Sequence, residues 1–410
     1  MNPFLSQTFI NIWCLHFNDA KDGTGFDFIT LLFKKSRYLP IYSNLGSTNT
    51  KGITYELNED EFFKINSEIC LIYDVPEYLQ SQPEPKHEKL GLYRVKQYPG
   101  YFIDLKQFNG LNDYLQKTFS KSSRYKLNKY KKRFESCFDV HYKVFTKDIN
   151  DDEFNFVFQE FRNLLKKRFD TKGLTNNNLN PKEWAFYKAV TLPMVREGKA
   201  ALFVIYDGER PVGVTLNFLS EKMVFDAITV FDIAYSKFHL GSITIIKLVE
   251  WAMREKFAIF DFSKGYFDYK ERWATNSYSF FYDIYYNKHN PISKSIAFAL
   301  KNFFIGKNML RNLNVNTAIN SFLFRLKKND NIDKTESEFQ FYEPSTTVDL
   351  SNEYHLITSV WGCTCQKAVF EFQYLNAEHT KDILIYENKN KANEYYIKGK
   401  SKDAFFRITT

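Results

Sequence analysis

The sequence predicts an α/β protein with a mixed β-sheet, flanking helices and a small C-terminal α+β unit. Three apolar runs lie between residues 200 and 230, and Asp207-Gly208 joins the first two as a tight hairpin turn does. Residues 241–256 then carry apolar side chains at helical spacing, and residues 258–260 form a short apolar strand. A helix that leads from one strand to the next places the two strands parallel, so the sheet is mixed.

The part of the chain before residue 200 supplies further elements. Short apolar runs occur at residues 8–17, 28–33 and 69–74, and turn residues separate them. The polar, Pro-rich segment 80–86 cannot be the interior of a strand and is a loop. Helical spacing predicts three helices, at residues 111–134, 152–170 and 181–197.

Residues 293–328 contain no acidic residue and combine seven lysines and arginines with regularly spaced apolar residues. They predict basic amphipathic helices that either pack on the preceding domain or lie on an anionic bilayer. Residues 329–336 predict a polar linker, and the tail beyond it predicts a β-rich unit with strands at 368–374 and 382–386. We therefore divide the chain into units 1–140, 141–290, 291–330 and 331–410.

Composition limits the class of protein. The 410 residues fit two domains with a small appendage, and 44% hydrophobic with 18% aromatic residues excludes general disorder. The formal charge of +8 favours an anionic partner such as a nucleotide-bearing cofactor, a lipid headgroup or nucleic acid, or reflects a solvated surface.

Five scattered cysteines argue against a disulfide framework and for a reducing compartment. Cys363 and Cys365 predict neighbouring strand residues that point to the same side, with no metal. No secretory signal is apparent, and no apolar run approaches the roughly 20 residues of a membrane span. We expect a cytoplasmic protein.

A motif follows the strand at 258–260. Asp261-Phe262-Ser263-Lys264-Gly265, followed by Tyr269-Lys270-Glu271-Arg272-Trp273, resembles the signature of the CelD-like branch of the GNAT acyltransferases, relatives of the FemAB peptidyltransferases. The resemblance extends over residues 100–290. It implies a GNAT-like sheet in two tandem halves, the N-terminal one degenerate. It also implies an acyl-CoA donor, acetyl-CoA first, a small amine acceptor and no metal.

The donor site is predicted at the start of the helix after the third strand, because free backbone amides and the helix dipole favour phosphate oxygens there. Gly241 permits a close approach of the backbone, and Lys237 can add a positive charge. The Arg and alternating glycines common in GNAT proteins are missing, which weakens the assignment of acetyl-CoA. The predicted donor-binding residues are Lys237, His239, Gly241, Ser242 and Thr244.

The catalytic residues are predicted at the ends of the two parallel strands. A carboxylate that accepts the proton of the amine is expected at Asp226, with Asp232 as an alternative, and either can instead be a cap or an ion-pair partner. Asp261 interrupts an apolar strand and is expected to pair with Lys270 or Arg272, or to orient the substrate. Tyr266 or Tyr269 can protonate the leaving thiolate, and Lys270 can attract a phosphate or the developing oxyanion. The alternative is an ion-paired turn that braces the next strand.

Three functions follow. The first is an N-acyltransferase that moves an acyl group from acyl-CoA to an amine, on an amino sugar or nucleotide sugar for envelope polysaccharide. The second is a FemAB-type peptidyltransferase that uses aminoacyl-tRNA, the only nucleic acid that we expect as a partner. The third is a non-catalytic scaffold that contacts the membrane through residues 293–328.

Overall fold

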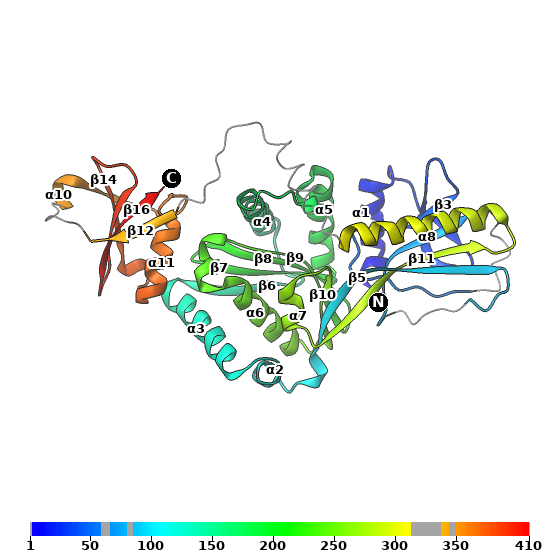
Figure 1. Cartoon of the computed structure of the whole chain (residues 1–410), viewed down its shortest axis with the longest axis horizontal. Helices are drawn as coiled ribbons and strands as arrows, with labels where there is room; N and C mark the ends of the chain where they lie inside the picture. The colour runs from blue at the N-terminus through cyan, green and yellow to red at the C-terminus, as the bar shows by residue number, and fades with distance from the viewer. Residues whose placement is uncertain (1, 59–65, 80–84, 313–337, 344–349, 410) are drawn as a thin grey trace.

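The computed structural model describes residues 2–58, 66–79, 85–312, 338–343 and 350–409. Within them the chain forms one eleven-stranded mixed sheet with helices on its faces and a separate five-stranded antiparallel sheet near the C-terminus (Figure 1). The predicted fold class is confirmed. The predicted linker at 329–336 and the second half of the basic segment lie outside the described residues.

Within the described part of residues 2–104 the chain forms one α-helix and five strands. Residues 8–17, an apolar run, lie in the helix. The elements are α1 (Gln7–Phe17), β1 (Thr24–Phe26), β2 (Ile29–Lys35), β3 (Ile41–Asn44), β4 (Ile69–Pro76) and β5 (Leu90–Asp104).

The central part follows the predicted order of helices and strands. The segment predicted as one helix at 111–134 is two helices, because Ser120 caps a new one by accepting a hydrogen bond from the Ser123 amide (3.3 Å). The elements are α2 (Leu111–Thr118), α3 (Lys121–Cys137), β6 (Val140–Phe145), α4 (Asp151–Thr171), α5 (Pro181–Arg196), β7 (Ala200–Asp207), β8 (Arg210–Leu219), β9 (Met223–Phe231), the 3-10 helix η5 (Ile233–Phe238), α6 (Leu240–Arg254), β10 (Ile259–Lys264) and α7 (Asp268–Trp273).

Two long elements then return to the N-terminal half, and the C-terminal unit follows. The elements are β11 (Asn276–Asn287), α8 (Pro291–Asn312), β12 (Glu338–Tyr342), α10 (Leu350–Glu353), β13 (Tyr354–Ile357), α11 (Gln366–Asn376), β14 (Leu384–Asn388), β15 (Glu394–Lys398) and β16 (Asp403–Thr409). The larger sheet has the order β1-β2-β3-β4-β11-β5-β10-β9-β8-β7-β6, so both halves of the chain share it. The boundaries at 140, 290 and 330, and the tandem GNAT-like halves, stay predictions.

Helices cover both faces of the central strands. α4 and α5 pack on one face, and α6 with α3 packs on the other (Figure 1). Each face has its own apolar core, so strands β7 and β8 are buried almost throughout. Strands buried on both sides have continuous apolar runs, which is why the sequence predicted them readily.

β9 and β10 are parallel neighbours that separate after three residue pairs. Within the described residues they pair from Met223–Ile259 to Phe225–Asp261, and β9 then runs on to Phe231 without β10. β10 turns away because Ser263 has a left-handed backbone (φ 60°), and its pairing with β5 is irregular at the same place. The sheet therefore opens between β9 and β10.

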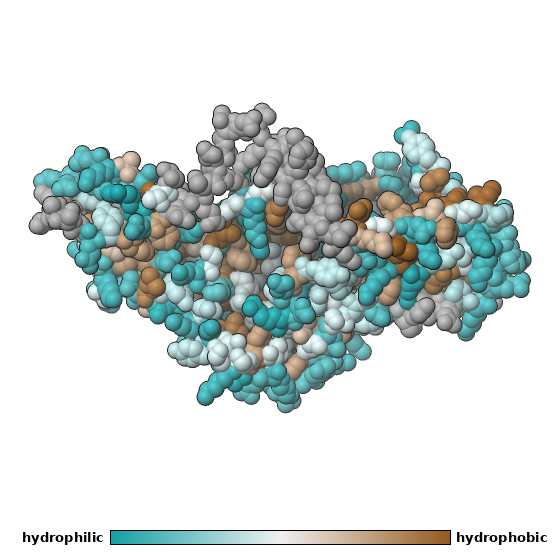
Figure 2. All heavy atoms as spheres, in the orientation of Figure 1, coloured by the Kyte–Doolittle hydropathy of each residue, from teal (hydrophilic) through white to brown (hydrophobic). Residues whose placement is uncertain are grey.

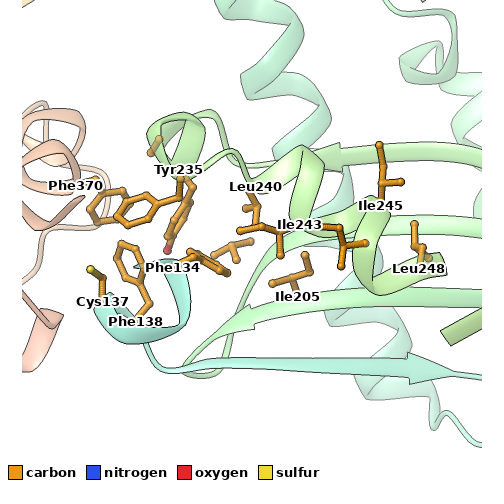
Figure 3. Close-up of a cluster of buried hydrophobic side chains, with 14 of the residues drawn as sticks. Phe134, Cys137, Phe138, Ile205, Tyr235, Leu240, Ile243, Ile245, Leu248 and Phe370 are labelled. Carbon is orange, nitrogen blue, oxygen red and sulfur yellow. The ribbon is translucent and has the colours of Figure 1, made fainter. Parts of the chain in front are cut away.

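The C-terminal unit docks on the central part through α11. Residues 368–374 were predicted as a strand and are helical. Phe370 packs against Phe138 and Tyr235 on one side, and the helix also contributes to the core below its own sheet (Figure 3). Residues 370–374 alternate aromatic and polar side chains (Phe-Glu-Phe-Gln-Tyr), which is the period of a half-buried strand, and in the helix even the polar Gln373 is buried. The strand predicted at 382–386 is confirmed as β14.

Cys363 and Cys365 were predicted as neighbouring strand residues, which is wrong. They lie in the turn before α11, where they form a disulfide, and Cys365 is the N-terminal cap residue of that helix.

Candidate active site

A cavity of about 310 Å³ fills the opening between β9 and β10. Its walls come from β9, the first turns of α6, β10 and α7, with one side chain from α4. It is lined by Arg168, Asp226, Thr229, Phe231, Ser236, His239, Leu240, Gly241, Ser242, Ile245, Leu248, Phe260, Tyr269, Arg272 and Trp273. Five of the nine predicted site residues line it, namely Asp226, His239, Gly241, Ser242 and Tyr269.

The first turn of α6 forms one end of the cavity. His239 adopts the left-handed conformation (φ 55°) between η5 and α6 and does not cap the helix with its side chain. A Cβ atom on Gly241 would lie 2.8 Å from the ring of Phe231, so only glycine fits without a shift of that ring. The first amides of a helix have no partner inside it, so this end of the cavity is suited to an anion.

His239 is held by stacking on Tyr130 of α3, with ring centroids 3.8 Å apart. Burial lowers the pKa of His239, and the positive charges of Arg272 and Lys237 lower it further. The imidazole is therefore neutral at pH 7, as expected for a residue beside a cluster of cations.

Asp226 lies on β9 just beyond the last β9–β10 pair, at a bulge where Ala227 is the extra residue opposite β8. The hydroxyl of Thr229 donates to its Oδ1 at 2.8 Å. Burial raises the pKa of Asp226, while the Thr229 hydrogen bond and the positive charges of Lys270 and Lys51 oppose the rise. A partly buried carboxylate with a raised pKa at the cavity wall is suited to accept a proton.

Tyr269 lines the cavity from α7, and burial raises the pKa of its phenol, with the charge of Asp226 adding to the rise. The phenol is therefore protonated at all working pH values and is suited to donate a proton or a hydrogen bond.

Lys270 is almost fully buried but points away from the cavity. Its Nζ donates to the carbonyl oxygens of Ser263 (3.2 Å) and Lys264 (3.0 Å), where β10 turns. Burial lowers its pKa to about 8, although Asp226 and Asp261 favour the charged form. Lys270 therefore holds the turn of β10 through backbone carbonyls, and its predicted catalytic role stays a prediction.

Asp261 is fully buried and does not line the cavity. It was expected to pair with Lys270 or Arg272, which is wrong. It accepts hydrogen bonds from the phenols of Tyr278 (2.9 and 2.7 Å) and Tyr78 (2.7 Å), and from the Ser263 amide (2.7 Å). Burial raises its pKa to about 6 in spite of these donors. Its partners come from β11 and from the segment after β4, so it links β10 to the N-terminal half.

Lys237 and Thr244 are not in the cavity wall. The Nζ of Lys237 pairs with Glu371 of α11 at 2.9 Å, and the Thr244 hydroxyl donates to the Leu240 carbonyl inside α6 (2.9 Å). The alternative base Asp232 pairs with Lys167 (2.7 Å) and caps η5 by accepting from the Ala234 amide.

A second cavity of about 220 Å³ adjoins the first between α3, α6 and α7. It shares four residues with the first cavity and adds five from the α2–α3 region. The shared residues are His239, Ser242, Arg272 and Trp273, and the added ones are Phe119, Ser123, Lys126, Leu127 and Tyr130. Sequence reasoning missed Arg168, Arg272 and Lys126 as site residues, although Arg272 lies within the motif itself.

Two buried polar side chains near the opening have no hydrogen-bond partner in the part of the chain that the structure describes. One is the indole N–H of Trp273, which lines both cavities, and the other is the amide of Asn217, which pairs through its backbone with Asp226. Buried polar groups normally have partners, so these two positions point to a ligand or water. Among the described residues no group of three metal-ligating side chains occurs.

Residues 121–271, from α3 to the motif on α7, match the family model described as an acetyltransferase (GNAT) domain. This part of the chain is therefore a GNAT-type acetyltransferase domain, and both cavities lie almost wholly within it. No curated protein matches the chain by sequence.

Solved structures resemble the chain at low identity. FemX is 11% identical over 72% of this chain and 94% of its own, with a TM-score of 0.49. A conserved protein of unknown function from Bacteroides thetaiotaomicron VPI-5482 is 9% identical over 69% of this chain and 91% of its own, with a TM-score of 0.45. A tandem GNAT protein from the clavulanic acid biosynthesis pathway is 10% identical over 62% of this chain and 77% of its own, with a TM-score of 0.33.

Proposed function

We propose that the protein is an N-acyltransferase that moves an acyl group from acyl-CoA, acetyl-CoA first, to a primary amine. The observation that carries this proposal is the cavity in the opening between β9 and β10, which is closed at one end by the start of α6. The Ser263 hydroxyl of β10 donates to the Asp226 carbonyl (2.9 Å), and beyond Asp226 the edge of β9 does not pair with β10, so an extended pantetheine arm fits along it.

The phosphates of the donor lie at the start of α6 in this proposal. The amides of the first turn, Arg168 and Arg272 supply donors and positive charge there, and Lys126 adds a cation from the second cavity.

The chemical step is a nucleophilic acyl substitution. The lone pair of the amine attacks the thioester carbonyl carbon, the C–S bond breaks, and the products are an amide and the free thiol. The Asp226 carboxylate accepts the proton that the amine loses, and the phenol of Tyr269 donates a proton to the leaving sulfur. Tyr269 and Asp226 line the same cavity, so the proton returns from the carboxylate to the phenol through solvent.

The test is binding of acetyl-CoA by isothermal titration, followed by an assay for release of the free thiol. Arg272→Ala is expected to weaken binding about tenfold or more, because a charge-assisted hydrogen bond contributes about 1.5–3 kcal/mol. Arg254→Ala, at the exposed far end of α6, is the matched control. A folded wild-type protein that binds no acyl-CoA would remove the proposal.

The acceptor that we propose is an amino sugar or a nucleotide sugar for envelope polysaccharide. The resemblance of the motif at 261–273 to the CelD-like branch supports this class. The test is a panel of amines with acetyl-CoA as donor, read by mass spectrometry. Turnover with simple alkylamines and not with any amino sugar would contradict the proposed acceptor while leaving the acyltransferase intact.

A second candidate donor is aminoacyl-tRNA, and the charge of α3 favours it. This helix carries seven lysines and arginines against one glutamate, and Lys126 reaches the second cavity. Salt-sensitive binding of tRNA, with no binding of acetyl-CoA, would select this function over the first.

A further inference from the structure

Helix α8 is apolar on two opposite sides. One side packs on β5 and β11, where Ala297 and Phe304 are buried and Phe304 stacks on Tyr282 with centroids 3.9 Å apart. The described part of the basic segment, residues 293–312, thus packs on the preceding sheet, as one of the two sequence interpretations expected. It leaves the outward side of the helix to be explained.

The outward side carries six large apolar side chains that are exposed. All but Ile305 are more than half exposed, although a helix on the surface normally turns polar residues to solvent. The six are Ile292, Phe298, Phe303, Ile305, Met309 and Leu310. Figure 2, in the orientation of Figure 1, shows apolar residues gathered along the position of α8.

The six side chains form one continuous face. At 100° per residue they fall within an arc of roughly 160°, and the remaining positions of that arc are small or uncharged. These positions are Pro291, Ser295, Ala299, Asn302 and Gly306. A contiguous apolar face of this kind on a surface helix marks an interaction site.

Cations border this face. Lys294 and Lys301 lie along one edge of the arc and Lys307 along the other, whereas Arg311 in the last turn stacks on Tyr98 of the sheet, 3.6 Å from its ring centroid. α8 contains no acidic residue, so its net charge is +4 from these four side chains. An apolar face between two basic edges complements a surface that is apolar inside and anionic at its rim.

We propose that α8 seats the protein on the surface of an anionic lipid bilayer, with the helix axis parallel to the membrane. The phenylalanines and aliphatic side chains enter the boundary of the acyl chains, and the lysines at the edges contact the lipid phosphates. Over its 22 residues the helix is about 33 Å long, enough for six turns of contact. A second copy of the chain fits this face less well, because two such helices would bring six lysines together at the edges of the contact.

The helix lies on the membrane and does not cross it. No helix in the described part of the chain is long and apolar enough to span a bilayer, and the other side of α8 is already buried against the sheet. The proposal is independent of the acyl-transfer chemistry, since α8 contributes no residue to either cavity.

The test is flotation of the full chain with vesicles of phosphatidylcholine alone and of phosphatidylcholine with 30% phosphatidylglycerol. Binding is expected only with phosphatidylglycerol present and is expected to fall at high salt. Phe298→Ser with Met309→Ser should reduce the bound fraction at least tenfold, and Lys294→Glu with Lys307→Glu should do the same. Leu15→Ser with Leu375→Ser, two exposed leucines on α1 and α11, should leave binding unchanged.

Circular dichroism and denaturation of each variant show that it is folded, so loss of binding can be assigned to the surface. Failure to bind phosphatidylglycerol vesicles would overturn the proposal, and so would equal binding to both kinds of vesicle. A dimer in solution that Phe298→Ser with Met309→Ser dissociates would assign the face to a second copy instead.

Discussion

Replacing Lys270 by methionine tests whether this buried lysine holds the turn of β10. Methionine keeps most of the apolar stem but removes the ammonium that donates to the carbonyls of Ser263 and Lys264. The lysine is 5% exposed, and burial lowers its pKa from 10.5 to about 8. Between these two pH values the unfolded chain binds a proton that the folded protein does not bind.

The free energy of unfolding of the wild type should therefore rise with pH through this window. At pH 8 the unfavourable protonation of Lys270 destabilises the fold by about 3 kcal/mol, and at pH 9.5 by about 1 kcal/mol. The wild type should gain about 2 kcal/mol from this residue between the two pH values, and Lys270→Met should lack that gain.

Urea denaturation at pH 8.0, 8.5, 9.0 and 9.5 measures the difference between the two proteins. The buried tyrosines also titrate at high pH, but they are common to both proteins and cancel in the difference. Lys222→Met, at the exposed turn between β8 and β9, is the control and should follow the wild type. If the free energies of unfolding of the wild type and Lys270→Met change with pH in parallel, the reasoning that burial lowers the pKa of Lys270 is refuted.

Two further predictions concern the carboxylates. Asp226→Asn should lower kcat by about 10²–10⁴ with little change in the Kd of acetyl-CoA, because the amide cannot accept the proton of the amine. The acid limb of the wild-type pH–rate profile should give an apparent pKa above the usual range of an aspartate, because burial raises the pKa of Asp226. An apparent pKa near 4 would contradict this prediction. Tyr278→Phe should lower the free energy of unfolding by about 1–3 kcal/mol at pH 7 and less at pH 5, because it removes a donor from the buried Asp261 carboxylate. The Asp261 carboxyl has a pKa of about 6 in the folded protein, so the free energy of unfolding falls as the pH rises from about 4 to about 6. Urea denaturation measures the change, with Tyr125→Phe as an exposed control.

The central sheet and part of the site could be predicted because their signals are local. The hairpin at Asp207-Gly208, the helix that ends before β10 and the polar residues after Phe260 are all set by spacing within about thirty residues. Asp226, Gly241 and Tyr269 come together because parallel strands joined by a helix bring their ends to one edge of the sheet.

The partners of the charged residues could not be predicted because they lie far away in the sequence. Tyr78 donates to Asp261 across 183 residues, and Glu371 pairs with Lys237 across 134 residues. The pattern of apolar residues indicates that Asp261 interrupts a buried strand, but it does not identify the side chains that donate hydrogen bonds to the carboxylate. Arg168 and Lys126 were missed for the same reason, since α4 and α3 reach the cavities only through tertiary packing.

The opening between β9 and β10 is held from both sides by elements outside the pair itself. β10 is drawn toward the N-terminal half by its antiparallel pairing with β5 and by the bonds from Tyr78 and Tyr278 to Asp261. β9 stays with β8, and the segment after it is fixed where Asp232 caps η5 and α11 packs on Tyr235. Because these contacts join each strand to a different part of the chain, closing the gap would break a buried carboxylate network or an aromatic core. Under the proposed function this opening is preformed for the donor, and the N-terminal half and the C-terminal unit support binding by holding it open.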